Sequence, residues 1–196
     1  MAKRSTGIRQ PEKGIVILGE GITEQFYFKH LKNIRGFVCS VRPHLFGKTS
    51  VNMLEKAIQQ LSGNSLTIIC VFDADVACRN AAENKKLAAL RYKYRNNHNV
   101  ILCDSLPTIE YWFLLHFLDT CPNYNKSLAV VRDLKKHIRV YEKSRAFLEN
   151  EKWVRDMAFS IGSMDEAMVR AERYGQGQAS YSRLYLAIRK LRETIH

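Results

Sequence analysis

Two stretches decide the fold: GIVILGEGITE at residues 14–24 and LTIICVFDAD at residues 66–75. Each begins as an apolar run rich in β-branched residues and ends in carboxylates. Apolar runs of this length, without polar alternation, predict strands that are buried on both faces of a parallel sheet. Ligands of such sheets gather just beyond the carboxyl ends of the strands. We therefore expect one acidic cluster at one edge of one sheet, formed by Glu20, Glu24, Asp73 and Asp75.

Size and charge narrow the class of protein. A length of 196 residues with 46% hydrophobic and 26% charged residues predicts one ordinary globular domain, with room for a helical appendage. The formal net charge of +12 indicates a polyanionic partner, with nucleic acid first and an anionic membrane surface second. The alternative is that the charge serves no particular partner.

Compartment is predicted from apolar runs and cysteines. The longest apolar runs fall short of the roughly 18–20 residues that span a bilayer, and the N-terminus lacks the pattern of a secretion signal. The five cysteines are odd in number and form no CxxC pair, which favours reduced thiols over disulfides or a zinc site. The sequence thus predicts a cytoplasmic protein.

The expected elements alternate between strand and helix up to residue 104 and are helical afterwards. Thr23 is a candidate cap of the first helix, and Gly36 a candidate end. A strand is expected at 37–46, a helix from Ser50 or Asn52, a helix at about 77–96 and a strand at 99–104. Pro107 opens a helix at 108–118, and further helices follow at 128–140, 143–158, 164–173 and 181–194. This order is typical of a parallel sheet wrapped by helices, with a helical C-terminal part.

The four carboxylates suit a hard divalent cation, because Mg²⁺ takes oxygen ligands. Asp73 and Asp75 lie two apart, and in an extended chain such side chains point to the same side. Glu24 falls in the first turn of a helix, where its charge also suits the helix dipole. If the first and third strands are neighbours, all four converge, and a bound cation relieves their repulsion. Taken singly, Glu24 is an ordinary first-turn residue and a DxD pair is common.

Basic residues supply candidate phosphate contacts. Lys48 stands in a GKTS sequence that lacks the earlier glycine of a phosphate-binding loop, so it is either a substrate-phosphate contact or part of a plain loop. Arg91, Lys93 and Arg95 interleave with tyrosines, and a similar mixture recurs at 139–143. Such a mixture favours a nucleic-acid surface, and the alternative is a solvated helix face.

Three motifs together resemble a known family: GEGITE at 19–24, VFDAD at 71–75 and SLPTIEYWFLLHF at 105–117. The first two resemble the Toprim domain, the metal-binding domain of topoisomerases, bacterial primases and nucleases of the overcoming-lysogenisation-defect group. The third is similar to a stretch of the RloB-like proteins, small Toprim proteins of bacterial phage-defence and restriction-associated loci. The resemblance implies a four-stranded parallel sheet in the order 2-1-3-4, flanked by helices. Residues 1–12 would then be a basic flexible arm, 13–118 the Toprim-like α/β domain, and 119–196 a helical extension packed on it.

The resemblance also implies roles for individual residues. Glu20, Glu24, Asp73 and Asp75 would bind Mg²⁺ or Mn²⁺, and Glu20, Asp73 and Asp75 would be catalytic, with Glu20 also a candidate for proton transfer. Glu110 would be a further metal ligand, a residue that holds a ligand in place, or a helix anchor. His116 and Trp112 are expected in the core.

The function expected from these observations is that of an Mg²⁺- or Mn²⁺-dependent phosphodiester hydrolase that cuts DNA or RNA in bacterial anti-phage defence. Lys48 or Arg79, which follows Asp75 in the chain, would neutralise charge on the substrate phosphate. The family setting implies an ATPase partner, and a homodimer is a further expectation. The alternative function is a non-catalytic Toprim-like module that binds nucleic acid or a partner of a defence complex.

Overall fold

The protein is described here from a computed structural model, which defines residues 14–42, 50–62, 66–118, 120, 122–159, 163–174 and 179–195. The strands are β1 (Ile15–Gly19), β2 (Ser40–Arg42), β3 (Thr67–Asp73), β4 (Val100–Leu106) and β5 (Tyr181–Ser182). The first helices are α1 (Ile22–Arg35), α2 (Val51–Leu61), α3 (Asp75–Arg79), α4 (Ala81–Tyr94) and α5 (Glu110–Leu114). The later helices are α6 (Ser127–His137), α7 (Arg145–Leu148), α8 (Lys152–Phe159), α9 (Ser163–Arg173) and α10 (Leu184–Arg192).

The strands form one sheet in the order β2-β1-β3-β4-β5. The first four strands are parallel, so the predicted order 2-1-3-4 is confirmed. The register pairs Gly19 with Val71, which places the carboxyl ends of β1 and β3 side by side. β5 was not predicted: it lies antiparallel to the end of β4, where the sequence pattern indicated a helix at 181–194. The neighbouring β1 and β3 meet the condition under which the carboxylates of the two stretches converge.

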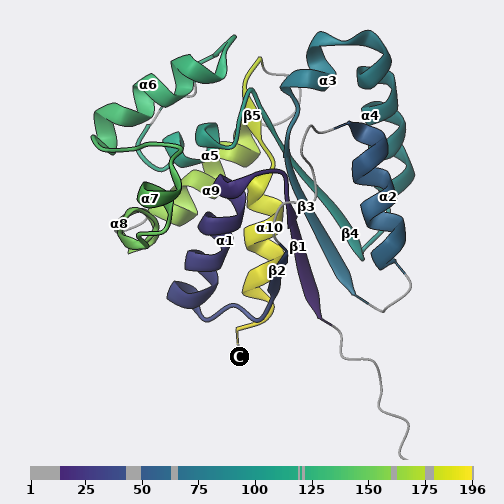
Figure 1. Cartoon of the computed structure of the whole chain (residues 1–196), viewed down its shortest axis with the longest axis horizontal. Coiled ribbons are helices and arrows are strands. Elements are labelled where there is room, and N and C mark those ends of the chain that lie inside the picture. The colour runs from purple at the N-terminus through teal and green to yellow at the C-terminus, as the bar shows by residue number, and fades with distance from the viewer. Residues whose placement is uncertain are drawn as a thin grey trace, which may run out of the picture.

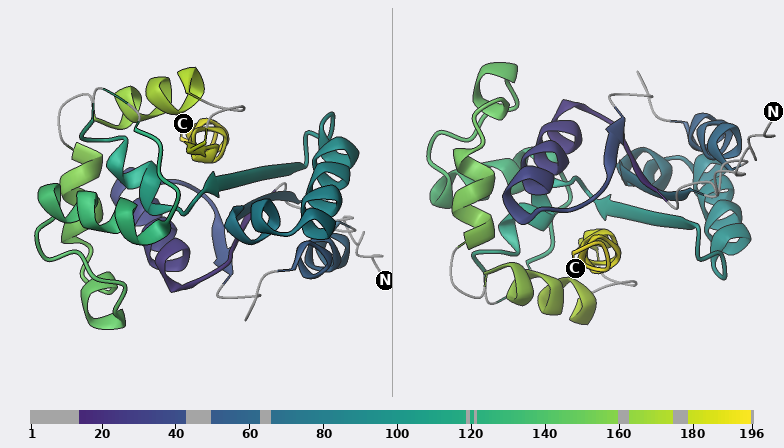
Figure 2. Two further views of the ribbon diagram at one scale, coloured as in Figure 1. Left: turned by 90° about the horizontal axis from the view of Figure 1, so that it is seen from above. Right: turned by 90° about the horizontal axis from the view of Figure 1, so that it is seen from below.

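Helices cover both faces of the sheet (Figure 1), which explains why its strands carry no polar alternation. Successive side chains of a strand point to opposite faces. Ile17 and Ile69 enter a core shared with α1, α5, α8 and α10. Leu18 and Cys70 enter a second core shared with α2 and α4. The molecule is therefore a three-layer α/β/α structure with the sheet in the middle (Figure 2).

Local capping explains several helix boundaries. Gly36 ends α1 in the left-handed conformation at φ 72°, as predicted. The Ser50 hydroxyl caps α2 by accepting from the backbone N–H of Met53, which settles the choice between Ser50 and Asn52. The helix predicted at 77–96 is two helices, because the Asn80 side chain accepts from the N–H groups of Ala82 and Glu83 and starts α4 anew.

Other predicted boundaries are wrong. Gly21, not Thr23, precedes α1, and Thr23 lies inside the helix. The strand predicted at 37–46 covers only Ser40–Arg42 among the described residues, since 43–49 lie outside them. The helix predicted at 108–118 is the short α5, which begins three residues after Pro107.

The C-terminal part is integrated with the sheet and is not a separate layer beyond it. α10 packs against β4, and α8 packs against α1. One core cluster runs from Ile17 of β1 through Trp112 of α5 to Leu191 of α10. The basic arm predicted at 1–12 lies outside the described residues.

The sequence also led to expectations about apolar segments and cysteines. None of the helices among the described residues combines the length and the apolar character that crossing a bilayer requires. Cys39, Cys70, Cys78 and Cys103 are free thiols, and Cys121 lies outside the described residues.

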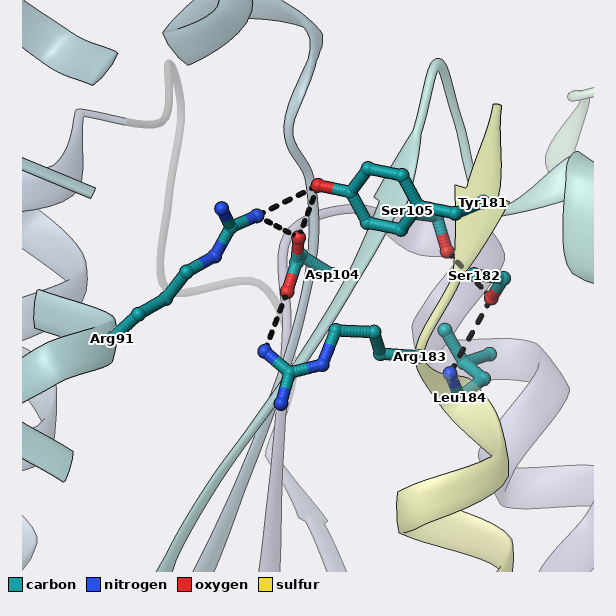
Figure 3. Close-up of polar contacts among 7 residues, drawn as sticks. All are labelled: Arg91, Asp104, Ser105, Tyr181, Ser182, Arg183 and Leu184. Carbon is teal, nitrogen blue, oxygen red and sulfur yellow. Dashed lines mark hydrogen bonds and ion pairs between the residues drawn. The ribbon is translucent and has the colours of Figure 1, made fainter. Parts of the chain in front are cut away.

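A buried carboxylate joins α4 and the C-terminal segment to the sheet (Figure 3). Asp104 of β4 is 0% exposed and accepts from Arg91 of α4 and, at 2.6 Å, from the Tyr181 hydroxyl of β5. Arg183, between β5 and α10, forms a second ion pair with Asp104 at 3.5 Å. One carboxylate thus holds two guanidinium groups from different parts of the chain.

We predict that Asp104→Ala lowers the free energy of unfolding by roughly 3 kcal/mol, because it leaves both guanidinium groups without their buried partner. Urea denaturation at pH 7 measures the loss. Asp156→Asn, which removes one partner of an exposed ion pair with Lys152, is the matched control and should cost less than about 1 kcal/mol. Equal losses in the two variants would contradict the conclusion that Asp104 holds α4 and the C-terminal segment to the sheet.

Candidate functional site

Glu20 is fixed at the carboxyl edge of the sheet by backbone contacts to β3. Its N–H donates to the Val71 carbonyl at 3.1 Å, which continues the β1–β3 ladder by one residue. Its carboxylate Oε2 accepts from the Asp73 N–H at 2.8 Å. The first and second motifs therefore meet through one charge-assisted hydrogen bond across 53 positions of sequence.

Glu24 is brought to the same edge by the glycines of the first motif. A side chain at Gly19 would place its Cβ 2.8 Å from the Cβ of Glu24, so only glycine permits this approach of α1 to β1. Glu24 Oε2 accepts from the Gly21 N–H at 2.9 Å, in the manner of a helix-capping glutamate. Glu24 is 5% exposed. The sequence GEG thus sets both the turn and the position of the second glutamate.

Asp73 connects the site to the segment after β4. Its Oδ1 accepts from the Ile109 N–H at 2.8 Å, just before α5 begins. The third motif of the sequence therefore contacts the second motif directly. Like Glu20, Asp73 is partly exposed, whereas Glu24 is buried.

Glu110 lies behind these residues and is held by three donors. It is 0% exposed, and Thr108, Tyr141 at 2.7 Å and Lys143 at 2.9 Å all contact its carboxylate. Both of its oxygens are engaged, so Glu110 holds Tyr141 and Lys143 against the site. The choice among a metal ligand, a residue that holds a ligand in place and a helix anchor, which the sequence left open, stays a prediction.

Lys143 is a functional candidate that the sequence reasoning missed. It lies on the segment between α6 and α7, and its side chain is 47% exposed. Burial lowers the pKa of Lys143, but Glu110, Asp73 and Glu24 outweigh that effect and raise it overall, so the ammonium stays charged. The sequence pattern that includes Lys143 is the mixture of basic and aromatic residues at 139–143. That mixture suggests a nucleic-acid surface and does not predict a contact with the acidic site.

The carboxylates perturb one another electrostatically. Burial, together with the charges of Glu110 and Glu20, raises the pKa of Glu24 from 4.5 to about 7. Burial, with the charges of Glu24, Glu110 and Glu20, raises the pKa of Asp73 well above its usual range, while Lys143 opposes the shift. Four acids from three motifs therefore share one low-dielectric region.

A divalent cation fits this region by donor chemistry and charge. The side chains are hard oxygen donors, and a cation would relieve the repulsion that raises the pKa values of Glu24 and Asp73. The described residues nonetheless contain no group of three or more Asp, Glu, His or Cys side chains close enough to enclose a metal ion. Glu20, Glu24 and Asp73 are the residues that would hold one.

Asp75 and Arg79 lie beside this group and are turned towards each other. Asp75 is the first residue of α3 and pairs with Arg79, which is 64% exposed, at 3.4 Å. Both line a cavity of about 180 Å³ that Cys78, Leu106 and Tyr124 also line. No contact joins Asp75 to Glu20, Glu24 or Asp73 among the described residues, so the structure does not bring together all four predicted ligands. Lys48 lies outside the described residues.

The three residues predicted to form a nucleic-acid surface have different environments. Arg91 is not a free surface residue, because it points inward to Asp104 and Tyr181. Lys93 is exposed and pairs with Glu55 at 2.6 Å. Arg95 is exposed and stacks 3.6 Å from the centroid of the Tyr92 ring.

His116 and Trp112 lie in the core, as expected. The Trp112 indole N–H donates to the Tyr27 hydroxyl at 2.8 Å. Burial lowers the pKa of His116 to about 4, so the imidazole is neutral at pH 7. A cavity of about 400 Å³ lies on the far side of this core, lined by Phe147 and Trp153 and by none of the site carboxylates.

The fold and site define a class: an α/β protein with a mostly parallel sheet and an acidic group at the carboxyl edge of its central strands. A comparison with protein families gives the family. The model of the RloB-like protein family matches residues 15–191, and the chain therefore belongs to that family. No curated protein and no solved structure shows detectable similarity to the chain.

We predict that Glu24→Gln removes a pH-dependent loss of stability. The raised pKa means that the folded state binds the Glu24 proton more tightly than the unfolded state does. Its contribution is therefore fully present below pH 4.5 and is lost as the pH rises through about 7. With EDTA present, Glu24→Gln should exceed the wild type by roughly 2–3 kcal/mol at pH 8, and by little at pH 5. Thermal and urea unfolding at both pH values check this, and an equal difference at both would refute it.

Proposed function

We propose that this RloB-like protein is an Mg²⁺- or Mn²⁺-dependent phosphodiester hydrolase that cuts DNA or RNA. The observation that carries the proposal is the meeting of Glu20, Glu24 and Asp73 at the carboxyl edge of β1 and β3. Burial and the charges of the neighbouring acids raise the pKa values of Glu24 and Asp73, and Lys143 opposes the rise at Asp73. Clusters of carboxylates with raised pKa values are more typical of functional sites than of hydrophobic cores.

The chain positions its acids before any substrate binds. The backbone N–H of Asp73 orients the Glu20 carboxylate, and the N–H of Ile109 orients the Asp73 carboxylate. When bound, a divalent cation would polarise the scissile phosphate and lower the pKa of the attacking water. Glu20, which is partly exposed, is the acid that we propose to accept the proton of that water, as the family resemblance also suggests.

Lys143 supplies a positive charge at the same place. Its ammonium lies 2.9 Å from Glu110, and its half-exposed side chain leaves it accessible from solvent. A cation fixed in this way can stabilise the charge that develops on the phosphate or on the leaving oxygen. The same role was expected of Lys48 or Arg79 from the sequence, and Lys143 is now the better candidate.

The substrate class rests on charge. The whole chain carries a net charge of +12 even with its acidic site included, which favours a polyanionic substrate. A bound metal would let that substrate approach the acids. The anti-phage setting, the ATPase partner and the homodimer rest on the family resemblance alone. The Toprim relationship rests on the first two sequence motifs and on the strand order 2-1-3-4.

The second candidate is a non-catalytic module that binds nucleic acid or a partner. The observation that favours it is the engagement of Glu110 by three donors, together with the absence of an enclosing set of metal ligands in the described part of the chain. In that case Lys143 takes the place of the metal as the resident cation.

We expect the protein to cleave plasmid, single-stranded DNA or tRNA with Mg²⁺ or Mn²⁺, and EDTA to abolish cleavage. Glu20→Gln and Asp73→Asn should each slow cleavage by roughly a hundredfold or more. Mn²⁺ should raise the unfolding temperature of the wild type but not of Asp73→Asn, because a ligand of the folded state stabilises it. Asp156→Asn is the matched control and should behave as the wild type. An unfolding temperature that no divalent cation changes would favour the binding module.

A second prediction separates Lys143 from the carboxylates. Lys143→Met should keep the stabilisation by Mn²⁺ and yet lose roughly a hundredfold in cleavage rate, since it removes phosphate stabilisation without removing a metal ligand. Lys143→Arg should recover part of the rate. Loss of the Mn²⁺ effect in Lys143→Met would show instead that the lysine shapes the metal site.

A further inference from the structure

The outer edge of β4 is open along most of its length. β5 pairs only with Ser105 and Leu106, and no other described strand lies beyond β4. In both views of Figure 2, β4 runs along the rim of the sheet between α4 and α10. An open edge of this kind presents backbone groups that can pair with another strand.

Backbone alternation identifies the open groups. The carbonyls of Asn99 and Ser105 accept from Ile68 and Ala74, so odd-numbered residues of β4 face β3. The carbonyl of Asp104 accepts from Arg183 on the other side, which confirms that even-numbered residues face outward. Val100 and Leu102 therefore direct their N–H and C=O groups to the open edge.

Arginines surround this edge. Val100, Leu102, Leu186 and the side chains of Arg91, Arg95 and Arg183 line one cavity of about 240 Å³. Asp104 offsets part of the charge of Arg91 and Arg183 and fixes both groups in place (Figure 3). The Nε groups of Arg91 and Arg183 are buried without an acceptor within the described structure. Arg95 donates to the Tyr92 carbonyl at 2.7 Å and stacks on the Tyr92 ring, and no carboxylate of the described residues forms an ion pair with it.

We propose that the open edge of β4 binds an extended acidic segment of a partner protein, which adds to the sheet as a further strand. Strand addition gives affinity through main-chain hydrogen bonds and specificity through alternate side chains. Side chains on one face of that strand would point towards α4, where Arg91 and Arg95 can meet carboxylates, and those on the other face towards α10 and Leu186. Charged residues beside an edge deter pairing in general, but arginines attract the one class of strand that carries opposite charge.

Charge also argues against occupants from this chain. A second copy paired through the same edge would face arginine with arginine, in a protein that already carries +12. The N-terminal 13 residues contain Lys3, Arg4, Arg9 and Lys13 against one acid, Glu12. An acidic partner strand is independent of the proposed hydrolase function, since the edge of β4 lies apart from the carboxylate group.

The test uses the full chain and a labelled synthetic peptide of about seven residues that alternates glutamate and valine. Fluorescence anisotropy should show binding, and hydrogen exchange should show slower exchange at the amides of Val100 and Leu102. A lysine–valine peptide should not bind. An acidic peptide with proline in place of valine, which cannot pair with an edge, should bind at least tenfold more weakly.

Arg95→Glu is the informative variant, because Arg95 has no role in the Asp104 network, and it should weaken binding at least tenfold. Lys85→Glu, a change of the same charge on the exposed side of α4 and outside the cavity lining, is the control and should bind as the wild type. Binding without protection of the two amides, or equal binding of the proline peptide, overturns the proposal. Sedimentation that shows self-association lost in Arg95→Glu would assign the edge to a second copy. Protection by a single-stranded oligonucleotide, but not by the acidic peptide, would assign the edge to nucleic acid.

Discussion

The site depends on one hydrogen bond between two strand ends, from the Asp73 N–H to the Glu20 carboxylate. This bond forms only because β1 and β3 are neighbours with a register that ends both strands at the same level. It draws a charged group to the sheet edge where Glu24 and Asp73 already lie. Burial, together with the charges of the neighbouring acids, raises the pKa values of Glu24 and Asp73, and a nearby cation would favour their charged forms. Local backbone pairing thus creates the electrostatic condition on which the proposed chemistry relies.

The C-terminal part of the chain completes the site and also the sheet. Tyr141 and Lys143 reach Glu110 from the segment after α6, while β5 and α10 pack on β4. One core cluster joins these elements to β1, so the helical extension has no independent interior. The family match over residues 15–191 agrees with this integration, since it covers the sheet and the later helices together.

The buried carboxylates of Asp104 and Glu24 have opposite electrostatic environments. Asp104 is buried with two arginines and a tyrosine, so its charge is compensated and serves to join α4 and β5 to β4. Glu24 is buried with other acids and with one lysine at a distance, so its pKa rises. A buried carboxylate that is paired with arginines helps to hold the fold together. A group of buried acids without such partners favours the binding of a cation. This difference separates the structural carboxylate from the candidate functional ones.

The sequence by itself determined the parallel sheet and three of its acids. Unbroken apolar runs can be buried only between two layers of helices, and the glycines around Glu20 allow only a tight strand-to-helix turn. The placement of Glu24 and Asp73 was predicted in this way, and the core positions of Trp112 and His116 from the apolar segment around them. The strand order was expected only from the family resemblance. The tertiary structure decided the rest, because those contacts join residues with no common local pattern. Lys143, which follows α6 in the chain, pairs with Glu110, and Asp75 pairs with Arg79. Arg91 points inward to Asp104, and Tyr181 belongs to a strand that pairs with β4. Side-chain direction and long-range partners depend on packing, and neither spacing nor composition encodes them.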